Sequence, residues 1–152
     1  MEDVCKQAKQ KALSLLADMD RTEEQLRKKL GQKFENEAVE QAIEYVKSFG
    51  YVNDLNYAKR YVENRKNTKS RKEIFAALSQ KGLQDDLIKQ AIELCYTQDD
   101  EEQAIRHLVE KKRFVAEEST EYDKKKLYAY LLRKGFRYEE VQKVIQVSCW
   151  NA

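Results

Sequence analysis

Residues 70–92 read SRKEIFAALSQKGLQDDLIKQAI, and this stretch decides the fold because its pattern recurs twice more along the chain. The related stretches are TEEQLRKKLGQKFENEAVEQAI at 22–43 and DKKKLYAYLLRKGFRYEEVQKVI at 123–145. Within each stretch apolar residues are spaced three or four apart, which is the period of an α-helix. Self-similarity of this kind is typical of proteins whose successive units stack and share a core. The sequence therefore predicts an all-α chain made of tandem repeats.

The three stretches carry apolar residues at equivalent positions on either side of a short turn. These positions are Leu26, Ile74 and Leu127; Leu30, Leu78 and Leu131; Phe34, Leu83 and Phe136; and Ile43, Ile92 and Ile145. Because similar side chains recur at the same spacing, we expect them to form the core of each repeat. Each stretch therefore encodes two helices joined by a turn.

Polar residues that can cap a helix stand where the first helix of each stretch is expected to begin. They are Thr22, Ser70 and Asp123. After the first two, a glutamine or glutamate follows three residues later, which is the spacing of a capping box. The dipeptide Lys-Gly at 81–82 and 134–135 predicts a helix end with a left-handed glycine. In the first repeat Gly31 comes one residue early, so we expect a different helix end there.

A further helix is predicted before each pair, around three alanines spaced 46 residues apart: Ala12, Ala58 and Ala104. The unit is thus a three-helix repeat, and its stacking predicts an elongated, curved array of either handedness. The three repeats are expected at 1–50, 51–97 and 98–152. His107 corresponds to Leu15 and Tyr61, so we expect it to be half-buried in packing. Looser joints are expected at 96–102 and 116–121.

Composition excludes several classes of function. The chain has 152 residues, with one histidine, three distant cysteines, four isolated glycines and no proline. These residues provide neither the paired ligands of a zinc site, nor a disulfide framework, nor a glycine-rich phosphate loop. Acidic runs such as 99–102 are expected on solvated helix faces, and Cys95 is expected in a helix core. We therefore expect no catalysis, no metal and no cofactor.

We expect the chain to be a soluble, cytoplasmic protein. It has no apolar run approaching the roughly 18 residues of a membrane span. Residues 1–6, MEDVCK, lack the apolar stretch of a secretory signal. The odd number of cysteines agrees with a reducing compartment.

The basic residues gather in two blocks, although the net charge is only +2. Residues 51–82 and 124–152 each carry a net charge of +5, and residues 83–123 carry −7. The blocks occupy equivalent places in the second and third repeats, so we expect them to face one side of the array. The candidate basic residues are Lys59, Arg60, Arg65, Lys66, Lys69, Arg71, Lys72, Lys124, Lys125, Lys126, Arg133, Lys134 and Arg137.

Tyrosines are interleaved with these cations, and aromatic rings can stack on bases where lysine and arginine bind phosphates. The candidate tyrosines are Tyr57, Tyr61, Tyr128 and Tyr130. The pattern indicates a surface for nucleic acid or for an acidic protein groove. The alternative is a set of solvated helix faces with the tyrosine rings in the core.

The chain resembles the bacterial RecX family in three ordered motifs. The central motif runs from Gly50-Tyr51-Val52-Asn53-Asp54 through Tyr57-Ala58, Tyr61, Arg65, Ser70, Ile74 and Leu78 to Lys81-Gly82-Leu83. The first motif is RTEEQL at 21–26, and the closing motif is KLYAYLLRKGF at 126–136. The resemblance covers about residues 8–148. Two positions depart from the family pattern: Gln25 replaces a glutamate, and the turn GQKF at 31–34 replaces a Lys/Arg-Gly turn.

The resemblance implies a specific function. Members of this family are small proteins of tandem three-helix repeats that modulate the recombinase RecA. They lie in the groove of the filament of RecA on single-stranded DNA, and they hinder strand exchange, ATPase and coprotease activity. The resemblance therefore implies a non-catalytic regulator of recombination, DNA repair and the SOS response, and we expect it to be a monomer. Its partners would be the RecA filament and the single-stranded DNA inside it.

Two other functions are compatible with the pattern of residues. A stand-alone nucleic-acid-binding module would use the basic helices alone, although the near-zero net charge disfavours high intrinsic affinity for DNA. A general helical-repeat scaffold for a protein partner would need only the repeat architecture. The family motifs favour the RecA modulator over both.

Overall fold

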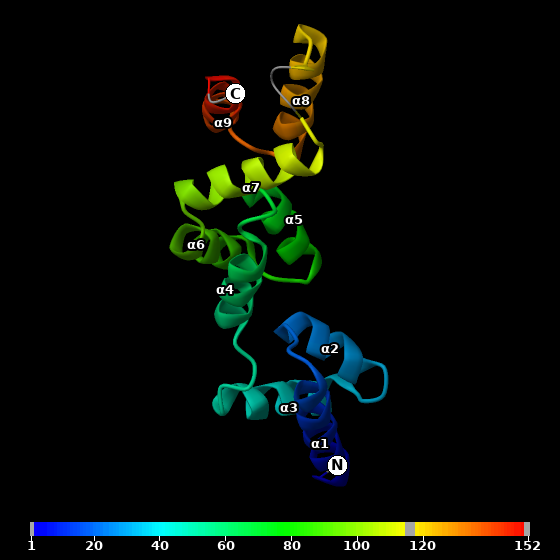
Figure 1. The fold of residues 1–152 in the computed structure, drawn as a ribbon. Helices are drawn as coiled ribbons and strands as arrows, with labels where there is room; N and C mark the ends of the chain where they lie inside the picture. The colour runs from blue at the N-terminus through cyan, green and yellow to red at the C-terminus, as the bar shows by residue number, and fades with distance from the viewer. Residues whose placement is uncertain (1, 115–117, 151–152) are drawn as a thin grey trace. The chain divides into compact units, whose positions relative to one another are not determined.

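The computed structural model describes residues 2–114 and 118–150, and in these residues it contains nine helices and no strand (Figure 1). The helices are α1 (Glu2–Asp18), α2 (Glu23–Gly31), α3 (Asn36–Ser48), α4 (Asp54–Arg65), α5 (Arg71–Gln80), α6 (Asp85–Cys95), α7 (Gln98–Lys111), α8 (Glu121–Lys134) and α9 (Tyr138–Trp150). The prediction of an all-α chain is confirmed. The helices follow one another in the three groups of three that the spacing predicts.

The chain divides into two compact units. The first is Met1–Ala58 with Leu78–Ile88, and the second is Lys59–Ala77 with Lys89–Ala152. In the first unit α1 packs along α3 and also contacts α2. Its core consists of Ala8, Ala12, Leu26, Leu30, Ala38, Val39, Ala42, Ile43, Val46 and Val52. In this unit α3 has the apolar face that the sequence predicts for the last helix of a repeat.

In the second unit α7 and α8 both pack against α9. The core there consists of Ala104, Ile105, Leu108, Val109, Leu127, Leu131, Phe136, Val141, Val144 and Ile145. The two cores therefore use equivalent residues of the first and third repeats.

The predicted repeat positions are buried in all three repeats. Ala12, Ala58 and Ala104 are fully buried, as are Leu30, Leu78 and Leu131. The exception is Phe34, which is half-buried in the turn at 31–34 of the first repeat. Burial of one position in every repeat explains why the apolar spacing could be recognised in the sequence.

Helix ends follow the expected chemistry, with one difference in the third repeat. Thr22 and Ser70 form the predicted capping boxes at the starts of α2 and α5. The prediction that Asp123 caps α8 is wrong, because α8 begins earlier, at Glu121. Its N-cap is Thr120, which forms a capping box with Asp123 as the third helical residue. The hydroxyl at 120 therefore replaces the carboxylate at 123 as the cap.

The turns that follow α2 and α8 differ as predicted. Gly135 ends α8 in the left-handed conformation, and Gly82 also has a positive φ, whereas Gly31 lies inside α2. The cap of α2 is instead Gln32, in the right-handed helical region. The departure at 31–34 is thus a real difference in backbone geometry.

Four finer predictions have different outcomes. The joint at 96–102 is not loose: Tyr96 and Glu101 are buried, and Thr97 forms a capping box at the start of α7. Part of the joint at 116–121 lies outside the described residues. The prediction for His107 is wrong, since its side chain is exposed, and Cys95 is half-buried, so its burial is only partial.

Candidate functional site

The basic residues and tyrosines that the sequence singles out lie, with one exception, in the second unit. Tyr57 belongs to the first unit, and the others belong to residues 59–77 or to α8 and the turn after it. In the second unit some of these cations meet buried or half-buried carboxylates. Others line two cavities beside α8. Residues of equal charge therefore lie in two different environments.

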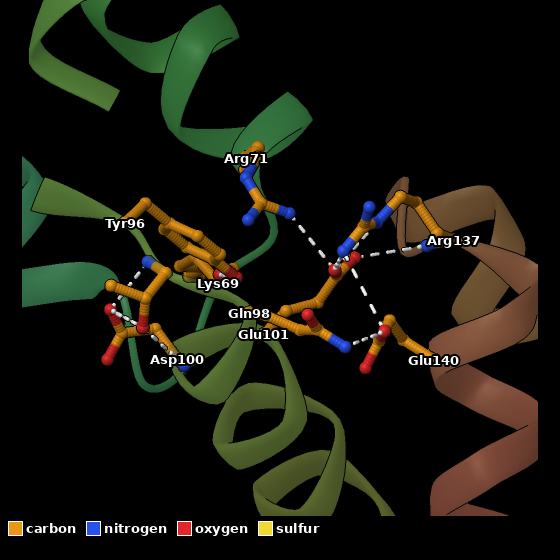
Figure 2. Close-up of polar contacts among 9 residues, drawn as sticks. Lys69, Arg71, Tyr96, Gln98, Asp100, Glu101, Arg137 and Glu140 are labelled. Atoms are coloured by element: carbon orange, nitrogen blue, oxygen red, sulfur yellow. Dashed lines mark hydrogen bonds and ion pairs between the residues drawn. The ribbon is translucent and has the colours of Figure 1, made fainter. Parts of the chain in front are cut away.

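Glu101 of α7 is the centre of the first environment (Figure 2). Its side chain is buried, and its Oε1 accepts hydrogen bonds from Nη1 of Arg71 at 3.0 Å and from Nε of Arg137 at 2.9 Å. The backbone N–H of Arg137 donates to Oε2 at 3.1 Å. A buried carboxylate is tolerated only when opposite charge and hydrogen-bond donors surround it. Glu101 therefore ties the start of α5 to the turn before α9.

The pKa of Glu101 reflects this surrounding. Burial by itself would raise the pKa, but the hydrogen bonds from the side chain and backbone of Arg137 and from Arg71 outweigh burial and hold the pKa below its usual value. The same contact raises the pKa of Arg137. Glu101 is therefore ionised at neutral pH.

Arg71 is also held by Tyr96, which follows α6 (Figure 2). The guanidinium carbon lies 4.5 Å from the centroid of the Tyr96 ring, a cation–π contact. Tyr96 is buried, and its hydroxyl donates to the carbonyl oxygen of Lys69 at 2.8 Å. Burial raises the pKa of the Tyr96 hydroxyl, which therefore keeps its proton for this bond. Arg71 is thus fixed between a ring and a carboxylate.

Three further predicted cations pair with acidic side chains of the same unit. Nζ of Lys134 lies 3.5 Å from a carboxylate oxygen of Glu73, and Nζ of Lys69 lies 4.0 Å from the same oxygen. Nζ of Lys66 lies 3.7 Å from Asp100. Partly exposed pairs such as these contribute little to stability, each about 0–1 kcal/mol.

A cavity of about 660 Å³ between the end of α7 and α8 forms the second environment. The cations in its lining are Lys112, Arg113, Lys126 and Arg133. Nζ of Lys112 lies 4.2 Å from the centroid of the Tyr130 ring. Among the described residues the lining contains one carboxylate, Asp123, which already accepts the N–H of Thr120 in the capping box. The cavity therefore offers positive charge and an aromatic ring to a ligand with negative groups.

A second cavity, of about 570 Å³, lies between α8 and α9. Its lining includes Lys124 and Lys125 together with the half-buried Tyr128. The ring of Tyr128 lies 5.7 Å from that of Tyr138, whose side chain is exposed. Nζ of Lys124 is 3.6 Å from the exposed Glu121. This cavity also combines cations with aromatic rings, and its lining includes the carboxylate of Glu121.

Four predicted basic residues lie outside these clusters: Lys59, Arg60, Arg65 and Lys72. The guanidinium carbon of Arg65 lies 5.0 Å from the centroid of the Tyr61 ring, so this predicted tyrosine contacts a predicted cation. Lys72 is exposed and follows Arg71 at the start of α5. The structure thus gathers some of the candidates of the second unit into local clusters and leaves others apart from them.

Sequence reasoning missed two residues of the first cavity, Lys112 and Arg113. They lie in the segment 83–123, whose net charge of −7 conceals them. The available signal was the run of three cations at 111–113, which spans the end of α7. A charge sum over a long segment is a poor guide when a few residues at a helix end face one cavity.

In residues 2–114 and 118–150 no group of three or more histidine, cysteine, aspartate or glutamate side chains is placed to hold a metal ion. No helix of the described chain is long and apolar enough to cross a membrane.

Models of the three RecX three-helix domains match the chain in sequence order. The first domain matches residues 8–45, the second matches 53–92, and the third matches 99–145. The predicted tandem three-helix fold is confirmed, as is the resemblance found in the motifs.

Curated relatives agree with these matches. Regulatory protein RecX of Caldanaerobacter subterraneus subsp. tengcongensis is 35% identical over 145 residues, which cover 94% of this chain and 71% of that protein. Regulatory protein RecX of Clostridium perfringens strain 13 is 32% identical over 149 residues, covering 95% of this chain and 70% of that protein.

Solved structures show the same fold. The crystal structure of RecX from Lactobacillus salivarius aligns with a TM-score of 0.81 at 26% identity, over 97% of this chain and 98% of that chain. Another crystal structure, of a regulatory protein RecX, aligns with a TM-score of 0.82 at 26% identity, over 96% of this chain and 73% of that chain.

Proposed function

The chain belongs to the RecX family of regulatory proteins, and we propose that it regulates the recombinase RecA. In this proposal it lies in the groove of the filament that RecA forms on single-stranded DNA. There it hinders strand exchange, ATP hydrolysis and coprotease activity, and so regulates recombination, DNA repair and the SOS response. The observation that most supports the proposal is the ordered match of all three RecX domains.

We propose that the repeats, at 1–50, 51–97 and 98–152, each contact the filament, and that the protein acts as a cytoplasmic monomer without catalysis or cofactor. Several weak contacts on one chain gain from effective concentration, because the first contact holds the next site close to its target. This explains why an array of small repeats would prefer a filament to a free subunit.

We propose that the predicted basic residues supply the electropositive contacts, and their surroundings support a division of roles. Lys126 and Arg133, with Lys112 and Arg113, line a cavity whose charge is open to a ligand. Lys124 and Lys125, with Tyr128, line the second cavity. Arg71 and Arg137 instead hold Glu101, so their main role is in the fold.

The experiment adds the purified chain to RecA that is free, bound to nucleotide, or assembled on single-stranded DNA. We expect binding selective for the filament, together with lower ATP turnover. Equal binding to single-stranded DNA with and without RecA would instead support a stand-alone nucleic-acid module. Binding to neither would support a scaffold for another protein.

A matched pair of variants tests the residues. Lys126→Glu with Arg133→Glu is expected to weaken filament binding about tenfold, because charge repulsion replaces attraction at the cavity. Lys6→Glu with Lys11→Glu makes the same charge change on exposed positions of α1 and is expected to alter binding less than about twofold. Equal losses in the two variants would refute the assignment of the cavity.

A further inference from the structure

The same buried contact occurs twice between successive repeats. Thr22, the N-cap of α2, is fully buried, and its Oγ1 donates to the carbonyl oxygen of Lys81 at 2.8 Å. Ser70 stands at the equivalent place before α5, is also fully buried, and its Oγ donates to the carbonyl oxygen of Lys134. The first contact lies within the first unit and the second lies within the second unit. A hydroxyl that caps one helix therefore also binds the end of a helix 59 or 64 residues later.

Each contact is completed by a glycine directly after the lysine. Gly82 and Gly135 have φ of +88° and +103°, a region that residues with a side chain rarely adopt. A Cβ at Gly82 would lie 2.5 Å from Cβ of Glu24, and one at Gly135 would lie 2.5 Å from Cβ of Lys72. Both positions therefore need glycine for two reasons: the left-handed backbone and the absence of space. We call Thr22, Lys81 and Gly82 the first joint, and Ser70, Lys134 and Gly135 the second joint.

The turn of the first repeat and the cap of the third repeat differ from this arrangement. The turn of the first repeat has Gly31 inside α2, and a Cβ there would meet nothing within 4 Å. In the third repeat the N-cap of α8 is Thr120, whose hydroxyl accepts the N–H of Asp123 and whose side chain is exposed, whereas Thr22 and Ser70 are buried. Among the described residues, a buried capping hydroxyl and a crowded glycine thus come together at the two places where one repeat meets the next. Helices of this chain can therefore begin and end without this pair of features.

We propose that Thr22 and Ser70 are positioning residues, which together with Gly82 and Gly135 fix how each repeat follows the one before. A hydroxyl-to-carbonyl bond is directional and, in a buried setting, costly to leave unmade, so it selects one arrangement of the two helices. A ligand that contacts more than one repeat then meets sites at a fixed spacing and loses less free energy in ordering them. The choice of the RecA filament as this ligand rests on the proposed function.

The test separates the joint from the helix cap, because the hydroxyls serve both. Thr22→Val and Ser70→Ala remove the donor, while Thr22→Ser and Ser70→Thr keep it. Thr120→Val is the matched control, since Thr120 forms the same capping box on α8 and is exposed. Filament affinity is measured at a temperature at which circular dichroism shows every variant to be folded.

We expect Thr22→Val and Ser70→Ala each to weaken filament binding about tenfold, as a multi-site contact does when its spacing is no longer fixed. The hydroxyl-retaining variants and Thr120→Val are expected to stay within about twofold of the parent chain. An equal loss in Thr120→Val would reduce the effect to helix capping and overturn the proposal. Unchanged binding in both donor-deleted variants would overturn it too.

A second measurement needs no ligand and keeps the proposal independent of the proposed function. Nitroxide labels are placed at 28 and 85 in the first unit, and at 76 and 139 in the second, in a background with all three cysteines replaced by serine. We expect Thr22→Val to broaden the first distance distribution, Ser70→Ala to broaden the second, and Thr120→Val to change neither. Unbroadened distributions would refute the joints even if filament binding fell. If the parent chain bound no filament, the proposed function would fail. The distances between the labels would then be the test of the two joints.

Discussion

The cations around Glu101 and those of the cavity between α7 and α8 have the same charge and opposite surroundings. Arg71 and Arg137 converge on one buried carboxylate. Lys126 and Arg133 face a cavity in which, among the described residues, the carboxylate of Asp123 is engaged in capping α8. The difference teaches that a basic block in a sequence can contain both internal ion pairs and an open surface. The two groups of cations differ in whether a buried carboxylate pairs with them.

The largest expected effect is the loss of the Glu101 carboxylate. Glu101→Ala is expected to lower the free energy of unfolding by about 3 kcal/mol, because it removes the buried carboxylate that accepts hydrogen bonds from Arg71 and Arg137. Urea unfolding followed by circular dichroism measures the change. The control is Glu102→Ala, whose ion pair with Lys143 at 2.7 Å lies at the surface and is expected to contribute much less to stability than the contacts of Glu101. Equal losses in the two variants would contradict the special role of Glu101.

A smaller effect is expected when one cation of each group is neutralised. Arg71→Gln should lower the free energy of unfolding by about 1–2 kcal/mol, because it removes a charged hydrogen bond to Glu101 and the contact with the Tyr96 ring. Lys126→Gln should change the free energy of unfolding by less than about 0.5 kcal/mol, as exposed substitutions usually do. If Lys126→Gln destabilised the chain more than Arg71→Gln, the two groups would have been assigned the wrong way round.

The pH dependence of stability should distinguish the groups as well. Because the pKa of Glu101 is lower in the folded chain than in the unfolded chain, its contribution is complete above the usual glutamate pKa of about 4.3. It is lost as the pH falls through the lower, folded value. The melting temperature of the parent chain should therefore fall more steeply below pH 5 than that of Glu101→Gln. Parallel curves for the two proteins would show that Glu101 is not a source of acid sensitivity.

The smallest expected effect is on the salt dependence of binding. If Lys126 and Arg133 each neutralise a phosphate of single-stranded DNA, replacing both with glutamine should reduce the log–log slope of binding against salt by about 1.4. Titration of the filament at four salt concentrations measures the slope. A weaker affinity with an unchanged slope would indicate that these residues contact protein and not phosphate.

The fold could be predicted largely from the sequence because its signals are local and repeated. Leu30, Leu78 and Leu131 are buried at the same position of each repeat, so the same helical spacing of apolar residues appears three times in the sequence. Capping boxes involve residues three apart, which the sequence displays directly. The start of α8 was misjudged because Asp123 is itself an acceptable N-cap, and nothing in the spacing favours Thr120 over it.

The environment of the basic residues could not be predicted, because it depends on contacts between distant residues. Glu101 lies 30 residues from Arg71 and 36 from Arg137, and the acidic run 99–102 reads as a solvated face. In the structure Glu101 is buried while its neighbour Glu102 is only half-buried. The joints were equally hidden: the capping pattern of Ser70 is visible in the sequence, but its bond to Lys134 is not.

The most direct measurement compares two double charge reversals for both stability and filament binding. Lys126→Glu with Arg133→Glu is expected to leave the melting temperature within about 2 °C of the parent and to weaken binding to RecA on single-stranded DNA about tenfold. Arg71→Glu with Arg137→Glu is expected to lower the melting temperature by about 10 °C or more, because like charges then surround buried Glu101. A cavity variant that bound filaments as well as the parent chain, at moderate salt and with unchanged stability, would contradict the account.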